Sequence, residues 1–292
     1  MSVPRNNPVA VFDSGVGGLS VLRHLCQRLP HERILYLADQ AHVPYGPRPD
    51  AEVRHFAQEI TRFFLKQRVK LIVVACNRAS AAALDDLRAT FPALPFVGME
   101  PAVKPAAAQT RSGKIGVLAT AGTFESRRYA NLRDRFARQI TVLEDSCAGL
   151  VPLIERGQLA TPETATLVTR VVAPMLDAGA DTLVLGCTHY PFVRAAIEAA
   201  VQALTDREVS IIDPAPAVAR QAGRVLLAHD LHAADAAPGT IEAFTTGDPE
   251  KFAALARQLL GYPLPATPLC WHDGRLRFLP DARPTRSRAH TV

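Results

Sequence analysis

The chain has 292 residues, of which 48% are hydrophobic and 21% are charged, and its formal net charge at pH 7 is +5. This balance is typical of a globular protein with a large core, and it excludes a disordered chain, a collagen-like repeat and a coiled coil. No apolar run approaches the roughly 18–20 residues that a membrane-spanning helix needs.

Neither the N-terminus nor the charge distribution indicates a membrane or nucleic-acid partner. The first residues, MSVPRNN, lack the apolar segment of a secretory signal, so we expect a cytoplasmic protein. The basic residues are dispersed along the chain, which argues against nucleic-acid binding as the main function. The five cysteines include no CxxC pair, a pattern that favours neither a disulfide framework nor a zinc site.

Short β-rich runs alternate with longer amphipathic segments along the chain. Apolar residues at helical spacing predict helices within residues 19–29 and 56–64, and Pro30 ends the first of them. The predicted strands, in chain order, are Val9–Phe12, Ile34–Leu37, Leu71–Ala75, Phe96–Val97, Ile115–Leu118, Ile140–Leu143, Leu183–Leu185 and Val209–Ile212. Strands that alternate with helices predict parallel sheets of the doubly wound kind.

The chain also contains an internal repeat of short segments in the same order. The matched pairs are VAVF at 9–12 with IGVL at 115–118, ILYLAD at 34–39 with ITVLED at 140–145, LIVVACN at 71–77 with TLVLGCT at 182–188, and PAV at 101–103 with PAV at 216–218. Their order indicates duplication of one α/β unit. The alternative, that apolar strands resemble one another by period alone, stays open.

The repeat predicts an α/β fold with two similar, doubly wound parallel-sheet domains and an active site in the cleft between them. We expect residues 1–103 to form the first domain and residues 104–210 to form the second. Residues 266–292 are rich in arginine, and we expect them to form a partly disordered C-terminal tail.

Two cysteines occupy equivalent places in the repeat. Cys76 and Cys187 each follow a continuous apolar strand, and ligand-binding residues gather beyond the carboxyl ends of parallel strands. If the halves face each other across a pseudo-twofold axis, the thiols flank one small molecule. Inverting a carbon acid needs a base on one face and an acid on the other, and a thiol with an ordinary pKa near 8.5 suits both roles.

Polar residues close to each thiol could assist it. Asp13 ends the first strand, and His189 lies two residues after Cys187, so each could hold or shuttle a proton. Ser14, Asn77 and Thr188 suit the carboxylate and ammonium groups of an amino acid.

Structural interpretations of the same residues remain open. Either cysteine could be packed core, Asp13 and Ser14 could cap a helix, and His189 could bond a backbone carbonyl. The glycine loop that follows Ser14 could cradle a phosphate. Cys76, Cys187, His189 and Asp13 could bind a metal, although they lack the closely spaced pairs typical of zinc. The other cysteines show no such pairing and are interpreted as structural: Cys26, Cys147 and Cys270.

Several stretches that together span most of residues 9–250 resemble the motifs of the cofactor-independent aspartate/glutamate racemase family. They are Asp13–Gly18, Pro44–Gly46, Ala75–Asn77 with Ala79–Ala81, Lys114–Thr120, Val151–Glu155, Gly186–Pro191 and Thr245–Asp248. The resemblance implies two α/β domains without a cofactor or metal, with residues 211–265 returning to the first domain. It also implies a two-base racemase that supplies D-glutamate for peptidoglycan, and it allows a homodimer.

The resemblance assigns a role to each matched position. It implies that Cys76 is the base for the D-isomer, assisted by Asp13, and that Cys187 is the base for the L-isomer, assisted by Glu155 and His189. The substrate-binding residues that we expect on this ground are Ser14, Pro44, Tyr45, Gly46, Asn77, Arg78, Thr120 and Thr188.

Arg78 departs from the family pattern, which usually reads Cys-Asn-Thr-Ala. Arginine is a long, permanently charged fork with five donors. It could bind a carboxylate and lower the pKa of Cys76, fill the pocket, or turn outward. An alternative function therefore stays open, which is altered amino-acid specificity or a catalytically impaired binding or regulatory protein.

Overall fold

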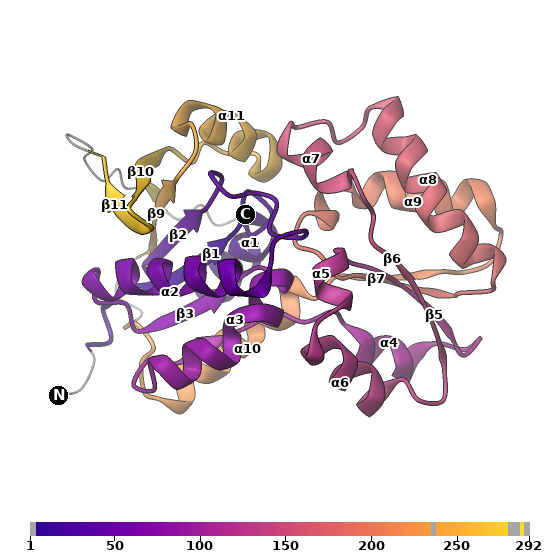
Figure 1. Ribbon diagram of the computed structural model, residues 1–292, viewed down its shortest axis with the longest axis horizontal. Helices are drawn as coiled ribbons and strands as arrows, with labels where there is room; N and C mark the ends of the chain where they lie inside the picture. The colour runs from indigo at the N-terminus through magenta and orange to yellow at the C-terminus, as the bar shows by residue number, and fades with distance from the viewer. Residues whose placement is uncertain (1–3, 235–237, 280–286, 289–292) are drawn as a thin grey trace. The chain divides into compact units, whose positions relative to one another are not determined.

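The computed structural model describes residues 4–234, 238–279 and 287–288, and it divides into two compact units. Unit 1 comprises Met1–Met99 and Ala215–Val292, and unit 2 comprises Glu100–Pro214 (Figure 1). Each unit has its own sheet and its own hydrophobic core.

Unit 1 has a mainly parallel sheet with the strand order β11-β10-β9-β2-β1-β3-β4, and β12 pairs with β9. The pairs β10–β11 and β9–β12 are antiparallel. The strands are β1 (Val9–Asp13), β2 (Ile34–Ala38), β3 (Leu71–Val74), β4 (Phe96–Val97), β9 (Thr240–Thr245), β10 (Ala266–His272), β11 (Arg275–Phe278) and β12 (Ser287–Arg288). The helices are α1 (Leu19–Arg28), α2 (Asp50–Lys66), α3 (Asn77–Thr90), α10 (Ala215–Ala228) and α11 (Pro249–Leu260).

Unit 2 has a parallel sheet with the order β6-β5-β7-β8. Its strands are β5 (Lys114–Leu118), β6 (Thr141–Asp145), β7 (Thr182–Leu185) and β8 (Ser210–Ile212). Its helices are α4 (Val103–Gln109), α5 (Ala121–Phe124), α6 (Arg127–Phe136), α7 (Leu150–Glu155), α8 (Pro162–Asp177), the 3₁₀ turn η1 (Tyr190–Val193) and α9 (Arg194–Leu204).

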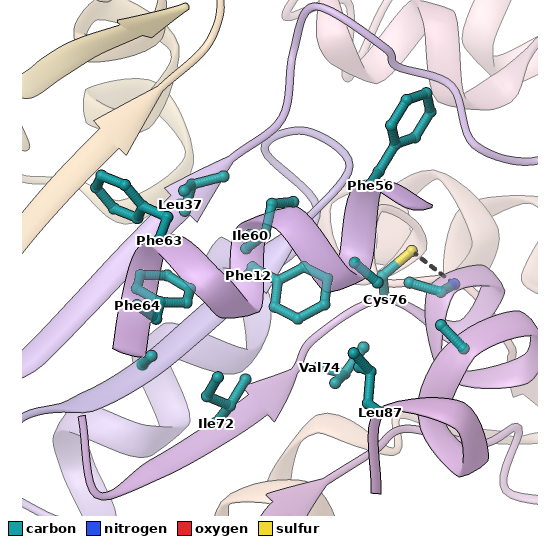
Figure 2. Packing of buried hydrophobic residues seen from close by; sticks show 14 of the residues in the cluster. Phe12, Leu37, Phe56, Ile60, Phe63, Phe64, Ile72, Val74, Cys76 and Leu87 are labelled. Carbon is teal, nitrogen blue, oxygen red and sulfur yellow. Dashed lines mark hydrogen bonds between the residues drawn. The ribbon is translucent and has the colours of Figure 1, made fainter. Parts of the chain in front are cut away.

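Alternating side chains of the unit 1 strands build a core against α2 and α3. Phe12 is fully buried and packs in one cluster with Leu37 and Val74 of the neighbouring strands and with Phe56 and Ile60 of α2 (Figure 2). Successive strand residues point to opposite faces, so the intervening residues face the other side of the sheet. There Tyr36 stacks on Phe252 of α11, with ring centroids 6.2 Å apart.

The predicted fold class is confirmed, because both units are α/β with the same local strand order. The order β2-β1-β3-β4 in unit 1 corresponds to β6-β5-β7-β8 in unit 2, which is consistent with internal duplication. The registers also correspond, since Val9 pairs with Leu71 in unit 1 and Ile115 pairs with Thr182 in unit 2.

One matched pair of the repeat is displaced. Val9 pairs with Ile34, whereas Ile115 pairs with Val142 rather than with Ile140. A shift by two residues keeps every side chain on the same face of the strand, so a sequence pattern cannot distinguish the two alignments.

The C-terminal segment differs from the sequence expectation. Residues 266–278 were expected in a tail, but they form β10 and β11 of the unit 1 sheet. Thr267 and Leu269 are buried at alternate positions of β10, and Leu276 is buried on β11, so these strands contribute to the core. Residues 280–286 and 289–292 lie outside the described residues, and the predicted domain boundaries stay a prediction.

Within the described part of the chain, no helix combines the length and the apolar character that crossing a membrane requires.

The position of Phe12 yields a stability prediction. Phe12→Ala should lower the free energy of unfolding by about 3–5 kcal/mol, because it removes a fully buried ring and leaves a cavity. Urea unfolding followed by the fluorescence of Trp271 measures the change, since Trp271 is the single tryptophan of the chain and packs against the same core. Leu227→Ala is the control, because Leu227 is 72% exposed on α10. Equal effects of the two substitutions would contradict this description of the core.

Candidate active site

The central strands of unit 1 end beside one another and bring acidic and thiol side chains to the same sheet edge. The Asp39 N–H donates to the Asp13 carbonyl at 3.0 Å, and the Ala75 N–H donates to the Phe12 carbonyl at 2.8 Å. The carboxyl ends of β2, β1 and β3 are therefore held together. Asp13, Asp39 and Cys76 lie at these ends, where ligand-binding residues of open parallel sheets gather.

Asp13 is fully buried and is surrounded by the glycine loop that follows β1. Its Oδ2 accepts hydrogen bonds from the N–H groups of Gly15, at 3.2 Å, and Gly18, at 3.0 Å. A Cβ added at Gly18 would lie 2.7 Å from the Asp13 Cβ, so glycine is needed for this close approach. The loop thus surrounds a carboxylate of the protein itself with backbone donors. Ser14, which lies in the same loop, is also buried.

Cys76 is the N-cap of α3 and lies between β3 and that helix. Its Sγ accepts a hydrogen bond from the Ala79 N–H at 3.4 Å, while its side chain packs at the edge of the Phe12 cluster (Figure 2). A helix N-terminus favours the anionic form of a thiol placed there. Cys76 therefore fits both interpretations: its side chain packs against the core, and its sulfur accepts a hydrogen bond at a helix N-terminus.

Asn77 and Arg78 begin α3 and are both buried, with 4% and 5% of their surface exposed. Neither the Asn77 amide oxygen nor its nitrogen meets a hydrogen-bond partner among the described residues. Arg78 turns to the start of α2, where Nη2 donates to the Arg48 carbonyl at 2.7 Å and Nη1 lies 2.7 Å from Oδ1 of Asp50. The charge of Arg78 is therefore compensated by Asp50, although its Nε meets no hydrogen-bond partner among the described residues, whereas the Asn77 amide has neither kind of partner there.

The loop between β2 and α2 carries Pro44, Tyr45 and Gly46, and a buried carboxylate holds it. The Tyr45 hydroxyl donates to Oδ2 of Asp39 at 2.6 Å. Burial, followed by the negative charge of Asp39 and then those of Cys76 and Asp13, raises the pKa of Tyr45 well above its ordinary value. Tyr45 is therefore a protonated hydrogen-bond donor that lies within electrostatic range of both Asp13 and Cys76.

Sequence reasoning missed Asp39, which is fully buried. It also accepts hydrogen bonds from the Trp271 indole at 2.7 Å and the Thr246 hydroxyl at 2.8 Å, and the His42 Nδ1 lies 2.9 Å away. The signal was present, because Asp39 ends a strand as Asp13 does. Its partners from the C-terminal segment could not be seen without the tertiary structure.

Unit 2 places Cys187, His189 and Glu155 in one hydrogen-bonded series. The Cys187 Sγ lies 3.7 Å from the His189 Nδ1, and the His189 Nε2 lies 2.7 Å from Oε1 of Glu155. Cys187 and His189 follow β7, whereas Glu155 is the last residue of α7. The structure thus brings to the second thiol both His189, which its spacing predicted, and Glu155, which the family resemblance implied.

Burial and hydrogen bonding act in opposite directions on His189. Burial alone would lower the pKa of this imidazole, but its contacts with the Cys187 sulfur and the Glu155 carboxylate raise it well above the ordinary value. A protonated imidazole favours the anionic form of a neighbouring sulfur. Proton transfer at a carbon acid is a chemistry that such a pair can perform.

The segment around Cys187 is held by a close backbone approach. The Gly186 N–H donates to the Leu118 carbonyl at 2.6 Å, and a Cβ at Gly186 would lie 2.8 Å from that oxygen. Thr188 is buried beside Cys187. Thr120 lies just beyond β5, where its hydroxyl is 3.1 Å from that of Thr123 rather than in the Cys187–His189–Glu155 series.

The remaining cysteines have different surroundings. Burial raises the pKa of Cys26 to about 12 and raises the pKa of Cys147 further, with the Asp145 charge adding to the latter effect. Such thiols stay neutral at ordinary pH. Cys270 is half-buried on β10. Among the described residues, no group of three or more His, Cys, Asp or Glu side chains is arranged to hold a metal ion.

Comparison with known proteins identifies a family and its relatives. The family model described as Asp/Glu/Hydantoin racemase matches residues 14–222. A glutamate racemase from Pseudomonas aeruginosa is 50% identical over 255 residues, which cover 87% of this chain and 94% of the relative.

Solved structures show the same similarity. A glutamate racemase isoform from Bacillus anthracis has a TM-score of 0.80 and 32% identity, covering 93% of this chain and 99% of that one. A glutamate racemase from Francisella tularensis, solved in complex with D-glutamate, has a TM-score of 0.78 and 29% identity, covering 90% of this chain and 97% of that one.

The surroundings of His189 predict a pH dependence. We expect its imidazole to remain protonated as the pH passes 6.5, its ordinary pKa. Because folding raises this pKa, the stabilisation is fully present below about pH 6.5 and is lost as the pH rises through the raised value. Glu155→Gln should lower the pKa of His189, as measured by NMR titration of ¹⁵N-labelled histidine.

Glu163→Gln is the matched control, because Glu163 is an exposed acid in the first turn of α8 in the same unit. It should leave the titration of His189 unchanged. Titration of His189 near pH 6.5 in the unmodified protein would contradict the hydrogen-bonded series as the cause.

Proposed function

Because this chain belongs to the Asp/Glu/hydantoin racemase family, we propose that it is a glutamate racemase that interconverts L- and D-glutamate without a cofactor. One observation carries the proposal: each unit has a cysteine directly beyond a central parallel strand, next to polar groups that can hold a proton. The relatives support the choice of substrate, since they are named glutamate racemases and one was solved with D-glutamate.

We propose that the two thiols exchange the roles of base and acid. In the direction that starts from D-glutamate, the Cys76 thiolate removes the Cα proton, and the electron pair of the C–H bond is delocalised into the α-carboxylate. The Cys187 thiol then returns a proton to the opposite face of Cα and becomes the thiolate. The reverse direction uses the same groups in exchanged roles, so no other reactant is consumed.

The surrounding residues support this chemistry in distinct ways. The His189 imidazolium stabilises the Cys187 thiolate, and Glu155 holds the ring through its other nitrogen. Asp13, with backbone donors around its carboxylate, is proposed to assist Cys76. Substrate contacts are proposed for Tyr45, a protonated donor, and for Asn77, whose amide meets no partner among the described residues.

The other predicted binding residues keep their proposed roles. Ser14 and Thr188 lie beside Asp13 and Cys187, Pro44 and Gly46 flank Tyr45, and Thr120 follows β5. The alternative hypothesis, a catalytically impaired binding protein, required that Arg78 occupy the substrate pocket. Arg78 instead bonds to Arg48 and Asp50, which supports the enzyme. We further propose that the D-glutamate serves peptidoglycan synthesis in the cytoplasm.

The division of labour between the thiols can be tested in heavy water. Cys76→Ser should lose deuterium exchange into D-glutamate but retain exchange without inversion into L-glutamate, because Cys187 is still present. Cys187→Ser should show the mirror pattern. Racemisation by each variant should fall about 10²–10⁴-fold, the usual cost of removing a general acid or base. Proton NMR at Cα and circular dichroism measure the two reactions.

Cys26→Ser is the matched control and should leave both reactions nearly unchanged, since Cys26 lies in the last turn of α1, at the far end of that helix from the loop that surrounds Asp13. Normal racemisation by Cys187→Ser would refute the two-thiol mechanism. If the unmodified protein neither racemises nor exchanges glutamate but acts on another amino acid in a substrate panel, the family member has a different specificity.

Asn77 yields a prediction that separates function from stability. Asn77→Leu should raise the KM for glutamate about tenfold, as the loss of a substrate hydrogen bond does, without lowering the melting temperature. The reason is that a buried amide without a partner costs stability, so its replacement by an apolar side chain of similar size removes that cost. Steady-state kinetics and thermal unfolding measure the two effects.

Ser80→Ala is a control with the opposite expectation. The Ser80 hydroxyl donates to the Val74 carbonyl and accepts from the Met99 N–H, at 3.1 and 2.9 Å. Its loss should lower the melting temperature and leave KM unchanged. An unaltered KM together with a lower melting temperature for Asn77→Leu would assign Asn77 to the core.

A further inference from the structure

Arg78 makes contacts that no role in proton transfer requires. Its side chain is 5% exposed, its Nη2 donates to the Arg48 carbonyl, and its Nη1 forms an ion pair with Asp50, both at 2.7 Å. Asp50 is the first residue of α2 and its side chain is 51% exposed. The guanidinium therefore bridges from the first turn of α3 to the first residue of α2 and the loop before it.

The bridged segment is the end of the loop that carries Tyr45 and Gly46. Arg48 in turn donates from Nε to the His42 carbonyl at 2.6 Å, within the same loop. At its beginning, the loop is held by Asp39, which binds the hydroxyl of Tyr45. The loop is thus fixed at one end by Asp39 and at the other by Arg78.

We propose that Arg78 is a positioning residue that fixes the Tyr45–Gly46 loop relative to the Cys76–Asn77 segment, and that Asp50 is its obligatory partner. The inference rests on the proposed function and adds to it a residue pair that acts through the loop rather than on the substrate. Arg78 directly follows Asn77 in the first turn of α3, so its hydrogen bond to Arg48 and its ion pair with Asp50 join the thiol segment and the loop within unit 1.

The guanidinium suits this role for geometric reasons. Its planar fork can donate to a carbonyl while it forms an ion pair with a carboxylate, whereas threonine is too short and uncharged and lysine presents its donors from a single atom. A buried guanidinium needs a counter-charge, because an uncompensated buried charge is strongly unfavourable. Asp50 supplies that charge, so the loss of either partner should release the loop.

The expected effect is on KM rather than on kcat. Cys76 is held by β3 and by its own bond to Ala79, and neither depends on Arg78. Loop residues that bind the substrate in the ground state and the transition state alike change KM and leave kcat nearly constant. A purely structural role would instead reduce the amount of folded enzyme, which lowers the apparent kcat and leaves KM unchanged.

The test is a double-mutant cycle on the full chain with glutamate as substrate. Asp50→Asn should raise KM about tenfold with kcat changed less than about twofold, and Arg78→Met should act similarly. The double variant Arg78→Met with Asp50→Asn should be no worse than either single variant, because both remove the same bridge. Asp50→Glu keeps the carboxylate and should restore most of the affinity.

Glu250→Gln is the matched control, since Glu250 is an exposed acid in the first turn of α11 in the same unit. It removes the same charge from a helix start and should leave KM unchanged. Unchanged KM in Asp50→Asn, or additive effects in the double variant, would overturn the inference while the unmodified enzyme still racemises glutamate. If the unmodified protein neither turns over nor binds glutamate, the proposed function itself fails.

Discussion

Parallel pairing of β1 with β2 and β3 is the constraint on which the unit 1 site depends. In a parallel sheet all carboxyl ends meet at one edge, so residues far apart in the sequence become neighbours there. Asp13, Asp39 and Cys76 meet because Phe12, Leu37 and Val74 are fully buried below them and set the register. Unit 2 repeats the arrangement with β5, and Cys187 follows β7 as Cys76 follows β3.

Charges at these edges are buried, and their compensation determines the local structure. Asp39 accepts hydrogen bonds from the loop that follows it, from the end of β9 and from β10. His189 is held between a sulfur and a carboxylate, and Arg78 between a carbonyl and a carboxylate. Each group would be costly to bury alone. Compensation therefore fixes loops that have no regular backbone hydrogen bonding of their own.

The Asn77 amide does not follow this rule. Ser80 on the same helix has both a donor and an acceptor contact, whereas the Asn77 amide has neither among the described residues. A buried polar group without a partner costs free energy that folding alone gives no reason to retain. Binding a polar ligand, as proposed for Asn77, would supply such a reason. The compensated Arg78 beside it is proposed instead to hold the loop in position.

Local sequence patterns determined the alternation of strands and helices, the internal repeat and the positions of both thiols at strand ends. These features can be predicted because the spacing of apolar residues and the residues that end helices are local properties of the sequence. The family assignment is confirmed, whereas the roles of individual site residues stay predictions. Pattern alone could not locate the two-residue shift between β2 and β6, since both alignments bury the same face.

Only the tertiary structure decided which distant segments complete the sheet edge. Residues 266–278 belong to the sheet because β9 and β10 pair in parallel beside β2, a contact between segments far apart in the sequence. The same holds for Trp271 on Asp39 and for Asp50 on Arg78. A charged side chain in a sequence shows that it needs a partner, but which partner it finds depends on how the strands between them have packed.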